Sequence, residues 1–178
     1  LHLCHHNLES IDTDKIDSGN AKHNLLLEVC YAAKHEGDLI NTHYTPHQQK
    51  YKDTGTASQL CTMLARSFAD IGDIIRGKDL YRGDDKENIK LQNNLKQIFQ
   101  NIQNKDEKLD GLSIDEVREY WWELNRQQVW KAITCGAPNN AQYFRFTCSE
   151  GGSIAHNKCT CINGDPPTYF DYVPQYLR

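Results

Sequence analysis

The residues with the widest chemical possibilities are seven cysteines, which could form disulfides, bind zinc or act as nucleophiles. They are unevenly spaced and gather toward the end of the chain: Cys4, Cys30, Cys61, Cys135, Cys148, Cys159 and Cys161. Their number favours disulfides formed in an oxidising compartment. Zinc is the alternative, but the Cys159-Thr-Cys161 pair lacks the usual gap of about two to four residues and has no matching second pair. Because seven is odd, at least one thiol is free or pairs outside this sequence.

No other motif indicates catalysis. The sequence has no nucleophile elbow, no zinc-protease helix signature and no glycine-rich phosphate loop. Adjacent side chains in Cys4-His5-His6 point in different directions, so they do not form a metal site by themselves. His43 and His47 would share one face of a helix, but Thr45-Pro46 disfavours helix there. We therefore expect a protein that is not an enzyme and needs no cofactor.

Charged residues offer two binding motifs, both open to simpler explanations. Arg82-Gly83-Asp84 spells the integrin-binding tripeptide, but it falls in a predicted loop where glycine and aspartate are ordinary turn residues. A group of basic residues surrounds it: Arg76, Lys78, Arg82, Lys86 and Lys90. Four carboxylates interleave with this group, so a solvated surface of mixed charge is favoured over an anion-binding patch.

Composition limits the class of protein. The 178 residues suffice for one domain with its own core, although the hydrophobic fraction is only 38%. The net charge of -4 argues against a nucleic-acid partner. No apolar run is long enough to span a membrane, and the amino terminus lacks a signal-peptide pattern. The chain is expected to be an excised fragment, with any leader or anchor outside it.

Apolar periodicity predicts four helices, over about residues 20–36, 58–76, 86–104 and 113–135. Gly37 is expected to end the first helix and Gly77 the second. Ser113 and Glu116 form a capping-box signature at the start of the fourth. The following cysteine-rich stretch, 137–167, is predicted to be irregular.

These elements predict an all-α fold: a disulfide-stapled helical bundle with a loop-rich, cysteine-containing flank. One core is expected to hold the apolar stripes of the second and fourth helices together: Leu64, Phe68, Ile71, Trp121 and Leu124.

Three long blocks resemble the hallmark blocks of Duffy-binding-like domains: Leu64–Gly77, Glu119–Trp130 and Pro167–Arg178. Their form is similar to the alpha class found in the erythrocyte membrane protein 1 adhesins of the malaria parasite. Leu3–Leu8 and the Cys159-x-Cys161 loop also match that class. The resemblance covers essentially the whole chain.

The resemblance implies a helical, cysteine-stapled module of three subdomains, of which residues 1–178 would form a single partial domain, mainly the second subdomain. It implies a host-cell adhesion role in rosetting or cytoadherence, on the extracellular face of the infected erythrocyte membrane. Candidate partners are red-cell or endothelial receptors, including sulfated glycosaminoglycans, blood-group sugars and complement receptor, besides neighbouring subdomains. The alternative is a structural scaffold whose receptor contacts lie in the missing subdomains.

The same resemblance implies that Cys4 pairs upstream and is unpaired in this chain. A Cys61–Cys148 bridge is expected to clamp the late loop to the bundle. Cys30, Cys135, Cys159 and Cys161 would form two more bridges, with connectivity open.

The five basic residues from Arg76 to Lys90 are the candidate glycosaminoglycan contacts, with Lys50 and Lys52 as weaker ones. Specificity is expected in loops outside the blocks: 12–20, 38–55, 80–88 and 149–158.

Overall fold

The computed structural model describes residues 21–50, 56–79 and 86–178. Within these ranges the regular elements are all helical. They are α2 (Ala21–Lys50), α3 (Thr56–Arg76), α4 (Lys86–Gln103), η1 (Glu107–Leu109), α5 (Ile114–Ile133), η2 (Phe170–Tyr172) and η3 (Gln175–Leu177). The predicted all-α fold is therefore confirmed.

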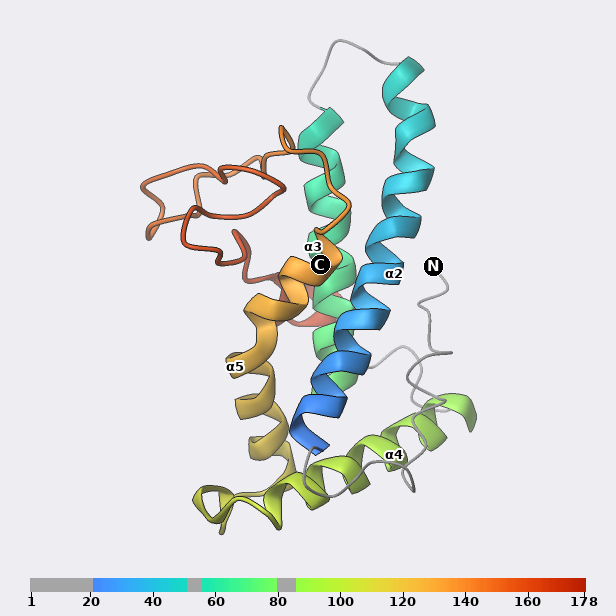
Figure 1. Cartoon of the computed structure of the whole chain (residues 1–178), viewed down its shortest axis with the longest axis vertical. Helices are drawn as coiled ribbons and strands as arrows, with labels where there is room; N and C mark the ends of the chain where they lie inside the picture. The colour runs from blue at the N-terminus through green and yellow to red at the C-terminus, as the bar shows by residue number, and fades with distance from the viewer. Residues whose placement is uncertain (1–20, 51–55, 80–85) are drawn as a thin grey trace.

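Three helices lie side by side and a fourth crosses them. Helices α2, α3 and α5 are in mutual contact, and α4 runs across the lower end of this group (Figure 1). The segment after α5 leaves the bundle as irregular loops beside the upper half of α3, then returns to α3 at η2 (Figure 1). The loop-rich flank thus stands on a helical base.

The core is built from the stripes that periodicity predicts. Leu64, Phe68 and Ile71 of α3 are buried. The Phe68 ring packs between two indoles, with centroids 5.2 Å from Trp122 and 5.1 Å from Trp130. Trp121 is also buried, against the ring of Phe99 on α4. Aromatic side chains therefore join α3, α4 and α5 in one core.

Leu124 is the exception, because 76% of its surface is exposed. The inward face of α5 carries Trp122, and Leu124 follows it by two residues, a rotation of about 200° around the helix. That rotation places Leu124 on the far side, and its predicted place in the core is wrong.

The predicted capping box at the start of α5 is confirmed. The Ser113 hydroxyl accepts from the Glu116 amide at 3.2 Å, and the Glu116 carboxylate accepts from the Ser113 amide at 2.7 Å. The hydrogen bond from the Ser113 backbone amide, and to a lesser extent that from its hydroxyl, lowers the pKa of Glu116. Two amides that the first helical turn would leave without acceptors are satisfied.

Helix α2 is longer than the sequence predicted. It continues through Gly37 and through Thr45-Pro46 to Lys50, so both the predicted stop and the predicted non-helical connection are wrong. A Cβ on Gly37 would lie 2.0 Å from the Ile133 carbonyl oxygen of α5. Gly37 thus allows two helix backbones to approach closely.

We expect Gly37→Ala to destabilise the protein by about 1–3 kcal/mol, because the added methyl overpacks this crossing. At an unobstructed helix position the same change would stabilise by about 0.5–1 kcal/mol. Urea unfolding of the two proteins therefore tests the sign of the effect. Increased stability of the variant would show that α2 and α5 do not approach so closely.

Two disulfides fasten the flank. Cys61 of α3 pairs with Cys159, and Cys148 pairs with Cys161. The predicted Cys61–Cys148 bridge is wrong, although a clamp from α3 to the late loop exists. This clamp is formed by Cys159 because the loop turns back. The turn brings Cys161 against Cys148 and leaves Cys159 facing α3. The zinc alternative is set aside, since Cys159 and Cys161 hold different disulfide partners.

Cys30 and Cys135 carry free thiols, so the expectation of two bridges among the remaining four cysteines is wrong. The Asn41 amide donates to the Gly136 carbonyl at 2.7 Å, which places Cys135 opposite the Asn41 turn of α2. Cys30 lies eleven residues earlier, about 16 Å along the helix axis. That separation is too long for a disulfide. Cys4 lies outside the described residues.

The two bridges should differ in their contribution to stability. Cys61–Cys159 closes a loop of 98 residues and Cys148–Cys161 one of 13. In the chain-entropy account, replacing the first pair by alanines costs about 4.7 kcal/mol and replacing the second about 3 kcal/mol. Urea unfolding of the two double variants measures this order. A larger cost for the 148–161 pair would contradict the clamp.

Candidate binding surfaces

Arg76 does not form part of an accessible basic patch. Its side chain is 2% exposed and lies among acceptors rather than facing solvent. Its guanidinium donates to the Asp73 carboxylate at 3.3 Å, to the Gly72 carbonyl at 3.0 Å and to the Asp171 carbonyl. Arg76 is therefore a scaffold residue, and its prediction as a glycan contact is wrong.

The other predicted contacts differ in availability. Lys78 forms an ion pair with Glu119. Lys86 and Lys90 lie one turn apart at the start of α4, and both are exposed. Arg82, its tripeptide and Lys52 lie outside the described residues, as does the side chain of Lys50. Among the described members of the predicted patch, Lys78, Lys86 and Lys90 are accessible, and Lys78 is engaged by Glu119.

A buried carboxylate, Asp171 of η2, connects two hallmark blocks. Its Oδ2 accepts from the Trp122 indole and from Arg126 Nε, both at 2.8 Å. Its Oδ1 accepts from Arg126 Nη2, also at 2.8 Å. Burial lowers the pKa of Arg126 while the Asp171 bonds and charge raise it, and the net shift is upward. The paired charges hold the returning chain on α5.

Sequence reasoning missed a second buried arginine, Arg118 of α5. Its guanidinium donates to the carbonyls of Ile75 at 2.6 Å and Ile74 at 3.0 Å, in the last turn of α3, and to the Gln92 side chain of α4 at 2.7 Å. Burial lowers its pKa to about 10, so it remains charged at neutral pH. A cation here satisfies carbonyls at a helix end, where the dipole is negative.

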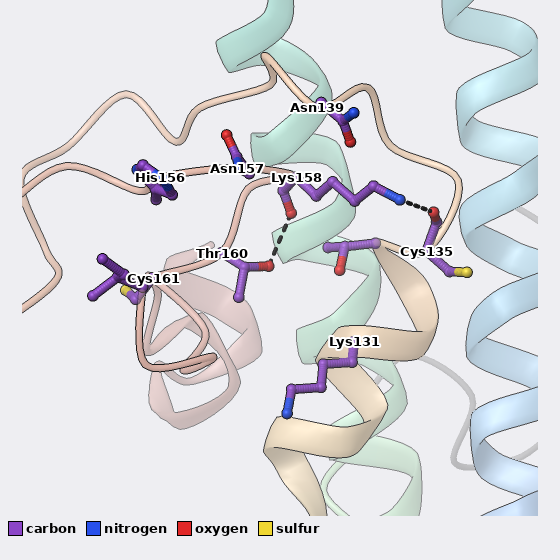
Figure 2. A pocket seen from close by; sticks show the side chains of 10 residues that line it. Lys131, Cys135, Asn139, His156, Asn157, Lys158, Thr160 and Cys161 are labelled. Carbon is purple, nitrogen blue, oxygen red and sulfur yellow. Dashed lines mark hydrogen bonds between the residues drawn. The ribbon is translucent and has the colours of Figure 1, made fainter.

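A cavity of about 540 Å³ lies where α5 ends against the disulfide-tied loops (Figure 2). Its lining includes Lys131, Cys135, Asn139, His156, Lys158 and Thr160. Sequence reasoning did not bring these residues together, because Lys131 is on a helix and His156 is 25 positions further along the chain. The expectation of specificity in loop 149–158 was the only signal that pointed here.

Comparison with known proteins identifies the family. Residues 1–178 match the Duffy binding domain, and the chain belongs to that family. It is 29% identical over 130 residues to the Duffy receptor gamma form of Plasmodium knowlesi, covering 71% of this chain and 10% of that protein.

Solved structures agree. The NTS-DBL1(alpha-1) domain of Plasmodium falciparum membrane protein 1 (PfEMP1), varO strain, is 40% identical, with a TM-score of 0.79. The match covers 99% of this chain and 40% of that one. An ICAM-1-binding PfEMP1 DBLbeta domain is 33% identical, with a TM-score of 0.75, over 99% of this chain and 39% of that one. The resemblance to PfEMP1 Duffy-binding-like domains is confirmed.

Two further observations concern membrane spanning and metal binding. Among the described residues no helix is both long and apolar enough to cross a membrane. In the same ranges, no three His, Cys, Asp or Glu side chains cluster so as to hold a metal ion.

Asp171→Asn should destabilise the protein by about 3–5 kcal/mol, because it leaves the Arg126 charge buried beside a neutral amide. Asp165→Asn is the matched control. That carboxylate is exposed, and it accepts hydrogen bonds from the neutral side-chain amides of Gln127 and Asn163. Thermal and urea unfolding measure both. Similar small costs for the two variants would show that the Asp171 network does not anchor the returning chain.

Proposed function

We propose that this chain is part of a host-cell adhesion module of a parasite surface antigen, displayed on the outer face of the infected red cell. Family membership over the whole chain carries the proposal. Structural neighbours support it, since one DBLbeta domain is described as ICAM-1-binding and a second PfEMP1 DBLb domain is described as bound to human ICAM-1. Host receptors on red cells or endothelium, engaged in rosetting or cytoadherence, are the proposed partners.

We further propose that residues 1–178 correspond mainly to the second, helix-bundle subdomain of an alpha-class domain. The chain spans about 40% of the PfEMP1 domain that it matches, and most of its length is a helical bundle. Neighbouring subdomains of the same protein would then be further partners.

A second candidate function is purely structural support. The Asp171 and Arg118 networks favour it, because the hallmark blocks are committed to internal contacts. On this alternative, receptor contacts would lie in the missing subdomains. Binding of the isolated chain to red cells, compared with binding of the complete domain, separates the two. Binding by the complete domain alone would favour the scaffold.

A sulfated glycosaminoglycan is the proposed partner for the exposed pair Lys86 and Lys90. Lys86→Glu with Lys90→Glu, in the complete domain, should reduce heparin retention most at low salt, because screening weakens exposed charge contacts. Lys105→Glu with Lys108→Glu is the matched control, since these lysines are also exposed and lie just beyond the other end of α4. The measurement is heparin retention of both double variants as a function of salt concentration. Unchanged retention of the first variant at every salt concentration would remove this pair from the binding surface.

A further inference from the structure

The turn from Asn157 to Thr160 has a costly backbone. Lys158 and Cys159 both have positive φ, 47° and 57°, although neither is glycine. The Thr160 amide donates to the Asn157 carbonyl at 2.9 Å and closes the turn. Side-chain-bearing residues avoid this left-handed region because Cβ crowds the backbone. Surrounding contacts must therefore impose the conformation.

Those contacts come from several directions. Cys159 is bonded to Cys61 of α3, and its amide donates to the Ala141 carbonyl at 2.8 Å. The Trp130 indole donates to the Thr160 hydroxyl at 3.1 Å. Lys158 stretches toward the end of α5 and donates to the Cys135 carbonyl at 3.0 Å, as Figure 2 shows. The turn is thus held over the cavity by a disulfide and by hydrogen bonds from α5 and the neighbouring loop.

The cavity beneath this turn is lined by two lysines and by no carboxylate. Lys131, His156 and Lys158 line it, and no Asp or Glu does, in a chain of net charge -4. Lys158 uses one of its three ammonium donors on Cys135, which leaves two. The end of α5 contributes only about half a negative charge, less than the two lysines supply. The local field therefore favours an anion.

We propose that this cavity binds an acidic sugar, through its carboxylate or sulfate group. Lys158 would hold the anionic group by a charge-assisted hydrogen bond, and Lys131, whose ammonium lies on another side of the cavity (Figure 2), would add a second positive charge. Asn139 and Asn157 add neutral donors and acceptors suited to hydroxyl groups, and the Thr160 hydroxyl, which donates its proton to the Lys158 carbonyl, adds an acceptor. The volume of about 540 Å³ lies within the range of roughly 300–1,000 Å³ for small-molecule sites.

This proposal deepens the adhesion function and rests on it for its biological meaning. It concerns a different surface from Lys86 and Lys90, which lie on α4, away from the end of α5 (Figure 1). Ile162, 82% exposed at the cavity, offers an apolar contact for a sugar ring.

Amide chemical shifts of residues 156–160 in the isotope-labelled chain test the site. Titration with glucuronate and with glucose 6-sulfate should shift these amides, whereas neutral glucose should not. Inorganic sulfate serves as the probe for charge alone and should bind more weakly than glucose 6-sulfate. Absence of shifts with both acidic sugars overturns the proposal, and equal binding of inorganic sulfate overturns the sugar assignment.

Lys131→Gln with Lys158→Gln should weaken acidic-sugar binding by about tenfold or more, since one charge-assisted contact and a second positive charge are lost. Glutamine at 158 can still donate toward Cys135, so the turn should persist. Lys105→Gln with Lys108→Gln is the matched control, since both lysines are exposed and lie outside the cavity, and it should leave the affinity unchanged. If the first variant fails to fold, His156→Ala, at an exposed position, provides the second test and should also weaken binding. Undiminished affinity in the cavity variants overturns the assignment.

Red-cell adhesion of the same variants separates this proposal from the adhesion function. Acidic-sugar binding without cell adhesion would keep the site and overturn the adhesion function of this chain. Adhesion with no acidic-sugar binding would overturn the site and leave the function in place.

Discussion

The structure depends on the buried carboxylate of Asp171. Its two oxygens receive donors from Trp122 and Arg126, so the chain that leaves α5 through the cysteine-rich loops is brought back against the same helix. The indole that it fixes packs on Phe68 of α3. Core packing and a buried ion pair therefore meet at one place. Because a buried charge without its partner is costly, this place tolerates little change.

Local rules predicted the parts of the fold that depend on neighbours in sequence. The stripe of α3, the stripe of α4 and the Ser113–Glu116 cap follow from helical periodicity and from unsatisfied amides at a helix start. The prediction that Gly37 ends the first helix was wrong because glycine both ends helices and allows two backbones to approach closely. Only the position of Ile133 across the crossing distinguishes them. The disulfide pairing likewise depends on how a loop folds back, which spacing does not encode.

Among the candidate binding residues, too, some positions follow from neighbours in sequence and others depend on how distant segments meet. A run of basic residues in sequence suggested one patch, yet Arg76 turned inward to Asp73 while Lys86 and Lys90 remained outside. The cavity beside α5 collects Lys131 and Lys158 from distant segments through a disulfide-held turn. In this chain the helices form the buried core and also carry the exposed Lys86 and Lys90, whereas the irregular flank forms most of the cavity.

Hydrogen exchange of the Trp122 indole N–H tests most directly whether Asp171 anchors the fold. If Asp171 anchors the fold, this proton exchanges only when the whole bundle unfolds, with protection equal to that of the slowest amides of α3. Exchange much faster than those amides, with the bundle otherwise protected, would show that the returning chain detaches on its own and would contradict the central role of Asp171.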